Sequence, residues 1–418
     1  MTLPDAFRPL PIRGFNAAGR ALEGAGVRPF RFDPESVLAK ARRMTGLDDF
    51  GGESFLPGLR RLTQSLEEDA RLHLFGRFFA RRQILELLCH RLRLQEHRRR
   101  HPAVADEAIE TPLFIVGLPR TGTTLVQGLL SMDPANRSPL SWEVDEPCPP
   151  ARSDTYTTDP RIETTERRFE QLRRLAPSFQ AIHPIGARMP QECIVLTAPE
   201  FLSLRFEMCF DVAGYQEWLP EQDMTGAYRF HRAFLQHLQS RHHAERWVLK
   251  SPGHFGCFEA LFAVYPDARI IQTHRDPVRI IPSVASLEYS MRQVASDHVD
   301  AHRLGRQMLR LWSRLTAQAL DFRTKHPERE AQFVDLQMDE ITGDPLGSVE
   351  RCYERFGFPF TAAAEGRMRL YLAAHPKHEF GEHHYTLADF GLDAEEIRAS
   401  FAPYRERFGV RDEPFGEA

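Results

Sequence analysis

Lysine is the scarcest charged residue in this chain of 418 residues. The lysines are Lys40, Lys250, Lys325 and Lys377, so 50 of the 54 basic residues are arginine. A G+C-rich genome is the simplest explanation of this bias. A lysine retained in an apolar setting still marks a position to examine, because a compact ammonium group and a planar arginine fork are not equivalent.

Long apolar runs, patterned cysteines and an excess of one charge are also missing. No run of about 18 apolar residues could cross a bilayer, and Pro4, Asp5 and Arg8 stand where a signal peptide needs an apolar stretch. The six cysteines form no Cys-x-x-Cys pair, which favours free thiols in a reducing cytoplasm over disulfides or a zinc site. A formal net charge of −4 argues against a dedicated nucleic-acid binder. We therefore expect a cytoplasmic protein without a transmembrane segment, and its oligomeric state stays open.

Apolar periodicity predicts an α/β fold behind an N-terminal helical segment. Residues 55–98 carry leucines at spacings near three and four, as amphipathic helices do, and Asp33-Pro34 is a helix start signal. Beyond Thr111, four short apolar runs alternate with helical stretches, and these runs span 113–117, 247–250, 268–273 and 332–336. Such alternation predicts a parallel sheet covered on both faces. We expect residues 1–108 to form a helical segment that packs on a domain spanning 109–418.

A glycine loop follows the first of these strands. It reads Gly117-Leu118-Pro119-Arg120-Thr121-Gly122-Thr123-Thr124 and leads into an apolar helix. Loop amides, hydroxyls and the helix N-terminus together form a cradle for an anion. A nucleoside triphosphate loop needs lysine after its second glycine, whereas this chain has Thr123 there and its cation at Arg120. The loop therefore favours a ligand with one 5′-phosphate over a Mg²⁺-bound triphosphate.

Two motifs in order resemble the sulfotransferase superfamily, which uses 3′-phosphoadenosine 5′-phosphosulfate (PAPS). Pro119-Arg120-Thr121-Gly122-Thr123-Thr124 is similar to that family's 5′-phosphosulfate loop. Arg275, after a later strand, with Ser283 eight positions on, is similar to its 3′-phosphate element, and an arginine fork suits a dianionic phosphate. The resemblance covers about residues 110–395. The N-terminal helices also resemble those of a broad bacterial branch of the family.

The resemblance implies a P-loop-like parallel sheet flanked by helices, and transfer of a sulfonate from PAPS to a hydroxyl or phenol of a small acceptor. The donor would be held by Arg120, Thr121, Gly122, Thr123, Thr124, Arg275 and Ser283. The product would be adenosine 3′,5′-bisphosphate, and no metal is required. The aromatic residues between Phe201 and Phe234 fit either an apolar acceptor cleft or helical core. The alternatives are a P-loop kinase acting on a small molecule and a non-catalytic nucleotide-binding protein.

Sulfuryl transfer needs a cation near the leaving phosphate and a base for the acceptor hydroxyl. Lys250 ends a predicted strand, where ligands of open α/β sheets bind, and the family places a leaving-group lysine there. Glu143 resembles by position the glutamate base of the carbohydrate- and tyrosine-sulfating branches. Glu146 and His254 are its rivals for that role.

A histidine-rich stretch, 375–385, lies near the C-terminus. Its spacing gives no histidine pair four residues apart on a helix, so we interpret it as a late loop that closes over the nucleotide or the acceptor rather than as a metal site.

Overall fold

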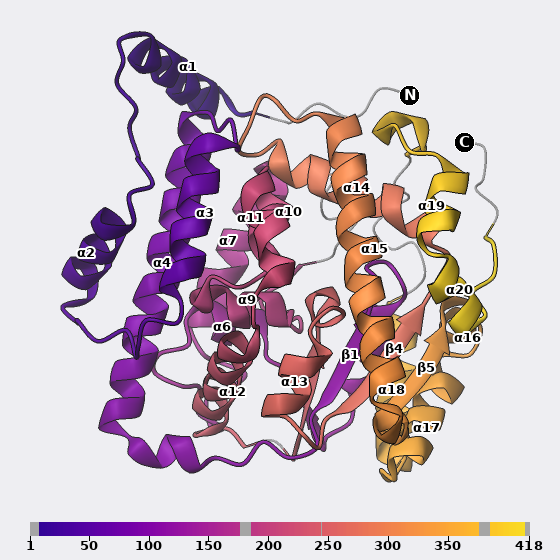
Figure 1. The fold of residues 1–418 in the computed structure, drawn as a ribbon. Helices are drawn as coiled ribbons and strands as arrows, with labels where there is room; N and C mark the ends of the chain where they lie inside the picture. Colours follow the sequence, from indigo (N-terminus) through magenta and orange to yellow (C-terminus); the bar gives the residue numbers. More distant parts are fainter. Residues whose placement is uncertain (1–7, 176–184, 244, 376–384, 414–418) are drawn as a thin grey trace.

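A parallel β-sheet lies at the centre of the computed structural model, which describes residues 8–175, 185–243, 245–375 and 385–413 (Figure 1). Within these residues the sheet has five strands in the order β2-β3-β1-β4-β5. They are β1 (Leu113–Gly117), β2 (Asn136–Arg137), β3 (Arg246–Lys250), β4 (Arg269–His274) and β5 (Phe333–Gln337). Ile115 pairs with Lys250 and Gly117 with Thr273, so the carboxyl ends of β1, β3 and β4 reach one edge of the sheet.

Helices cover both faces of the sheet, because successive strand residues point to opposite sides. Leu113 and Ile115 of β1 are buried with one set of helices: α5 (Thr123–Leu130), α16 (Met338–Gly343), α17 (Pro345–Phe356) and α18 (Ala362–Ala374). Phe114 and Val116 belong to a second cluster. Its helices include α12 (Thr225–Gln239), α13 (Phe258–Val264), α14 (Pro277–Arg292), α15 (Ala301–Lys325), α19 (Ala394–Ser400) and α20 (Ala402–Phe408).

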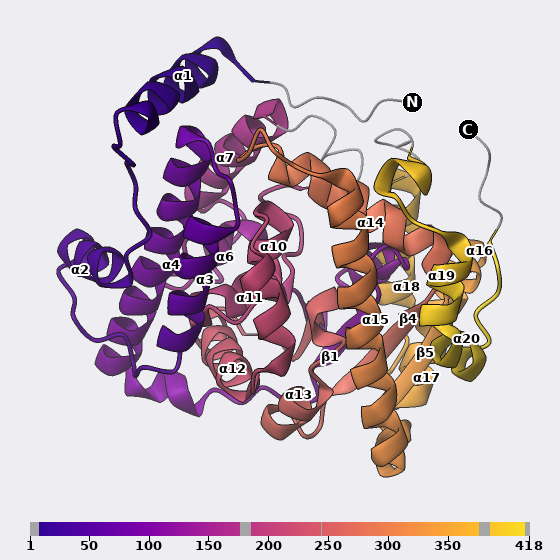
Figure 2. The ribbon, with the colours of Figure 1, turned by 45° about the horizontal axis from the view of Figure 1, so that its top comes forward.

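The N-terminal helices lie to one side of the sheet. They are α1 (Leu10–Gly24), α2 (Pro34–Thr45), α3 (Leu56–Glu68) and α4 (Leu74–Arg100). The start signal at Asp33 acts as expected, since its carboxylate accepts a 2.7 Å hydrogen bond from the Ser36 amide. Figures 1 and 2 both show α10 (Arg205–Cys209) and α11 (Ala213–Trp218) between α3 and α14. These helices share one buried cluster with α3, α4 and the end of α14, so the N-terminal segment has a core in common with the middle of the chain.

Among the described residues between β2 and β3 lie three helices not yet mentioned: α6 (Ser141–Asp145), α7 (Arg161–Leu175) and α9 (Cys193–Thr197). The described helices include none that is long and apolar enough to cross a membrane.

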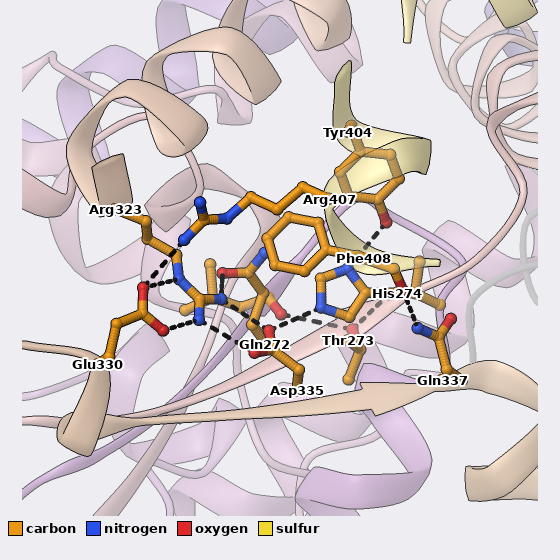
Figure 3. Close-up of polar contacts among 12 residues, drawn as sticks. Gln272, Thr273, His274, Arg323, Glu330, Asp335, Gln337, Tyr404, Arg407 and Phe408 are labelled. Carbon is orange, nitrogen blue, oxygen red and sulfur yellow. Dashed lines mark hydrogen bonds and ion pairs between the residues drawn. The ribbon is translucent and has the colours of Figure 1, made fainter. Parts of the chain in front are cut away.

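A polar network fixes the carboxyl end of β4 against β5, α15 and α20 (Figure 3). His274 is fully buried and hydrogen-bonds to Asp335 at 2.8 Å and to the Tyr404 hydroxyl at 3.1 Å. Arg323 of α15 donates to both oxygens of Asp335, at 2.7 and 3.0 Å. Because Arg275 follows His274 directly, this network determines where the backbone of Arg275 leaves the sheet.

The predicted α/β fold with a helix-covered parallel sheet is confirmed, and each of the four apolar runs forms a strand. The two-residue edge strand β2 was not predicted, because two residues are too few to show any periodicity.

Candidate active site

The glycine loop connects β1 to α5 with a backbone that suits an anion. Gly117 has φ 149° and lies so close to Thr273 that an added Cβ would be 2.5 Å from its carbonyl oxygen. Gly122 has φ 86° and precedes α5, whose first turn has no side-chain cap. The amides of that turn are therefore left for a ligand. Arg120 has φ 66°, which strains a residue other than glycine and is typical of functional loops.

Two contacts tie this loop to the end of β4. The buried hydroxyls of Thr121 and Thr273 lie 2.6 Å apart, and Thr121 also donates to the Leu118 carbonyl at 2.7 Å. Arg275 Nη1 donates to the Arg120 carbonyl at 3.1 Å. The two motifs that are far apart in the sequence are therefore neighbours in the fold.

Arg275 presents its guanidinium fork to a carboxylate. Its Nε and Nη2 donate to Glu413 at 3.0 and 2.8 Å, a bidentate arrangement that a phosphate would also accept. The amide of Glu413 in turn donates to Asp276, which caps the start of α14 through the Val278 amide. Ser283 lies further along α14 and is buried, with 3% of its surface exposed.

Lys250, at the end of β3, pairs with a carboxylate that the sequence analysis did not single out. Its Nζ lies 2.5 Å from Glu192 Oε1 and 3.5 Å from the Thr124 hydroxyl. The side chains of Lys250 and Glu192 are 3% and 13% exposed, so the pair is largely shielded from water. A cation, a carboxylate and a loop hydroxyl thus meet beside the anion cradle.

A cavity of about 370 Å³ brings these groups together. Of the predicted site residues, those that line it are Arg120, Gly122, Thr123, Thr124, Lys250 and Arg275. Glu192 lines it as well. The rest of the wall is largely apolar. Its side chains come from several helices, among them Phe79 of α4, Phe169 of α7, Val195 of α9, Met208 of α10 and Leu287 of α14.

Thr121, Ser283 and Glu143 are not among the residues that line the cavity. Glu143 is fully buried, and its carboxylate accepts hydrogen bonds from Arg137 at 2.6 Å, Tyr156 at 3.0 Å and the Leu140 amide at 3.0 Å. These contacts fix the start of α6. The structure therefore does not bring Glu143 to Lys250, and its role as a base stays a prediction.

The two rivals of Glu143 also lie outside this cavity. Glu146 pairs with Arg168 at 2.8 Å. His254 Nδ1 is 2.6 Å from the Tyr228 hydroxyl, and the ring faces a second cavity of about 50 Å³. Burial, and then the charge of His231, hold the pKa of His254 well below its ordinary value.

Glu192 was missed because its signal is only its position in the fold. It precedes α9, in a stretch without a motif, 58 residues before Lys250. The late histidine-rich stretch cannot be placed, because residues 376–384 lie outside the described residues. Within the parts of the chain that the structure covers, no group of three or more His, Cys, Asp or Glu could hold a metal ion.

Comparisons with known proteins agree with this geometry. The model of the sulfotransferase family matches residues 112–362. The omega-hydroxy-beta-dihydromenaquinone-9 sulfotransferase Stf3 of Mycobacterium bovis is 24% identical over 305 residues, which are 68% of this chain and 72% of that protein.

Two solved structures are similar over nearly their whole length. Sulfotransferase STF1 of Mycobacterium tuberculosis superposes with a TM-score of 0.79 at 31% identity, covering 88% of this chain and 98% of that one. Sulfotransferase STF9 of Mycobacterium avium superposes with a TM-score of 0.81 at 32% identity, covering 90% and 97%. The chain therefore belongs to the sulfotransferase family and is a sulfotransferase enzyme.

Proposed function

We propose that this enzyme transfers a sulfonate from PAPS to the hydroxyl group of a small, hydrophobic acceptor. The observation that carries the proposal is one cavity in which the glycine loop, Lys250 and Arg275 meet an apolar wall. An anionic donor fits the first part and an apolar acceptor fits the second. A cavity of this kind, apolar with a few convergent polar groups, is typical of small-molecule sites.

The residues present fit the donor. The uncapped first turn of α5, with Arg120, Thr121, Gly122, Thr123 and Thr124, would hold the 5′-phosphosulfate. Arg275 would hold the 3′-phosphate, since its guanidinium already donates two hydrogen bonds to the Glu413 carboxylate. Ser283, on α14, would assist it, and this assignment follows from the sequence pattern.

The reaction is an in-line displacement at sulfur. The acceptor oxygen forms a bond to sulfur while the bond from sulfur to the bridging phosphate oxygen breaks, and the acceptor proton passes to a carboxylate. Lys250, at the end of β3, stabilises the negative charge that develops on the bridging oxygen and on the departing adenosine 3′,5′-bisphosphate. Shielding of Lys250 from water strengthens this interaction.

The proton acceptor has two candidates. Glu143 follows from the sequence pattern, but three hydrogen bonds engage its carboxylate away from the cavity. Glu192 lines the cavity and contacts the lysine that would lie over the leaving group. A base must be within hydrogen-bonding reach of the proton that it takes, so the geometry favours Glu192.

The apolar wall supports a hydrophobic acceptor, and the relative named for an omega-hydroxy-menaquinone derivative is consistent with this class. The enzyme would therefore act on the hydroxyl of an apolar molecule. A cytoplasmic location remains the expectation from the sequence.

Ligand-induced thermal stabilisation tests the donor. Adenosine 3′,5′-bisphosphate without Mg²⁺ should raise the melting temperature, since a ligand that binds only the native state stabilises it, and ATP with Mg²⁺ should do much less. The opposite ranking would favour a kinase. Labelled PAPS with a host metabolite extract, followed by mass spectrometry for an added sulfonate, identifies the acceptor. Bisphosphate binding without any transfer would instead indicate a non-catalytic protein.

A further inference from the structure

The cavity is also lined by polar side chains that the proposed reaction does not use. Among them are Gln83 of α4, Arg205 and Glu207 of α10, and Glu288 of α14. They come from elements other than the strand ends that would bind the donor. Helix α4 belongs to the N-terminal segment, so this segment contributes directly to the cavity wall.

Glu207 is a buried carboxyl group with an unused oxygen. Only 2% of its surface is exposed, and its Oε2 has no hydrogen-bond partner among the residues that the structure describes. Burial, and then the charge of Glu288, raise the pKa of Glu207 well above its ordinary value. A carboxyl oxygen accepts hydrogen bonds, and a protonated carboxyl group can also donate one.

The nearby arginine does not satisfy this carboxyl group. Arg292 donates its Nε to the backbone carbonyl of Glu207 at 2.9 Å, its Nη2 to Glu288 at 2.9 Å and its Nη1 to Gln307 at 2.9 Å. The guanidinium is thus engaged by other groups. Arg292 fixes the backbone of α10, and Glu207 lines the cavity with its Oε2 lacking a partner among the described residues.

Two more buried polar atoms at the same cavity lack partners within the described part of the chain. They are Oε1 of Gln83, whose residue is 8% exposed, and Nε of Arg205. A buried polar group without a partner destabilises the fold. Three such groups on one cavity are explained if a ligand supplies the missing hydrogen bonds.

We propose that Gln83 and Glu207 form a polar subsite for the acceptor, which binds a second O–H or N–H group on the same apolar molecule whose hydroxyl receives the sulfonate. The inference rests on the proposed function, since it assigns the cavity to the acceptor. An acceptor of this class has an apolar body and two polar groups. One that lacks the second group would leave Gln83 and Glu207 unpaired and would be selected against.

The test compares long-chain alcohols with matched α,ω-diols of several chain lengths. We expect kcat/KM for the best diol to exceed that of its mono-alcohol about tenfold or more, as a buried hydrogen bond predicts. Glu207→Met and Gln83→Leu should each remove this preference, and Glu207→Gln should restore part of it. Tyr215→Phe is the control for lost stability, because its buried hydroxyl bonds to the Phe201 carbonyl at 2.9 Å outside the cavity lining. It should keep the preference.

Binding gives a second readout that does not require turnover. With adenosine 3′,5′-bisphosphate present, the diol should raise the melting temperature of the wild type more than the alcohol does, and the two should be equal in Glu207→Met. Equal responses in the wild type at every chain length, or a preference that survives Glu207→Met, would overturn the subsite. Failure of the bisphosphate itself to stabilise the wild type would instead count against the proposed function, while the diol–alcohol comparison in its absence still tests the subsite.

Discussion

Replacing Glu192 by glutamine tests the chemistry of the site most directly. The substitution keeps the shape of the side chain but removes its charge and most of its basicity. If Glu192 takes the acceptor proton, kcat should fall by about 10²–10⁴, the usual contribution of a positioned general base. This range corresponds to about 2.7–5.4 kcal/mol of lost transition-state stabilisation.

The same substitution should also affect stability, because Lys250 would lose its partner. The pair joins Nζ and Oε1 at 2.5 Å with both side chains largely buried. Removing one partner of a buried pair costs about 3–5 kcal/mol, and the 13% exposure of Glu192 places the expected cost at the lower end. Bound bisphosphate should reduce this loss, since its charge gives Lys250 a new partner.

Initial rates of sulfonate transfer, measured by mass spectrometry across pH, separate these effects. The acidic limb of the wild-type pH–kcat profile should disappear in Glu192→Gln. The matched comparison is Glu143→Gln, which should lower the melting temperature by weakening the contacts to Arg137 and Tyr156 but leave the acidic limb in place. A Glu192→Gln enzyme with wild-type kcat and an intact acidic limb would refute the role of Glu192. Loss of that limb in Glu143→Gln alone would establish Glu143 as the base.

Four further substitutions test the proposed donor site and the network that supports it. Lys250→Arg should keep bisphosphate affinity, measured by calorimetry, and lose most turnover, whereas full activity would show that a compact charge is not needed. Arg275→Ala should weaken bisphosphate binding about tenfold or more. Glu413→Gln should strengthen it, because the carboxylate that competes for the Arg275 guanidinium becomes a neutral amide. Unchanged affinity in both variants would show that Arg275 does not bind the 3′-phosphate. Burial alone would raise the pKa of Asp335, but hydrogen bonds from His274 and Arg323 lower it to about 2. The ionised carboxylate therefore stabilises the folded protein above about pH 4, and this contribution is lost as the pH falls toward 2. At pH 7, Asp335→Asn should therefore unfold at a lower urea concentration than the wild type. Near pH 2 the urea midpoints of the two proteins should be nearly equal. An unchanged midpoint at pH 7 would contradict this account.

The fold was predictable because its signals are local. Each apolar run of β1, β3, β4 and β5 is short, rich in branched residues and followed by a helix, and the structure moves its boundaries by only one residue or so. The glycine loop was equally readable, since its backbone conformation depends on Gly117 and Gly122 themselves. Edge strand β2 has no such signal, because only its pairing with β3 defines it.

Residues that serve the site through distant contacts were harder to identify. Glu192 has no motif around it, and its relation to Lys250 exists only after β3 and α9 pack together. For Glu143 the reverse is true. Its position in the sequence is typical of a catalytic base, but in the folded protein its carboxylate accepts hydrogen bonds from Arg137 and Tyr156. A carboxylate that follows the glycine loop and its helix in the sequence is therefore weak evidence for a catalytic base until its hydrogen-bond partners are known.

The polar and the apolar parts of the cavity also differ in how far the sequence predicts them. The residues proposed to bind the donor lie in two short motifs, which follow β1 and β4. These strands are adjacent in the sheet, so their carboxyl ends lie together and a motif after each strand predicts a shared site. The apolar wall proposed for the acceptor is formed mainly by α4, α7, α9, α10 and α14, whose lining residues range from Phe79 to Met291 and share no sequence pattern. Because α4 precedes the sheet altogether, a change in how the N-terminal helices pack would alter the acceptor without touching the donor. The proposed acceptor specificity therefore depends on tertiary packing, and substitutions at Gln83 and Glu207, whose buried oxygens lack partners in the described structure, test it directly.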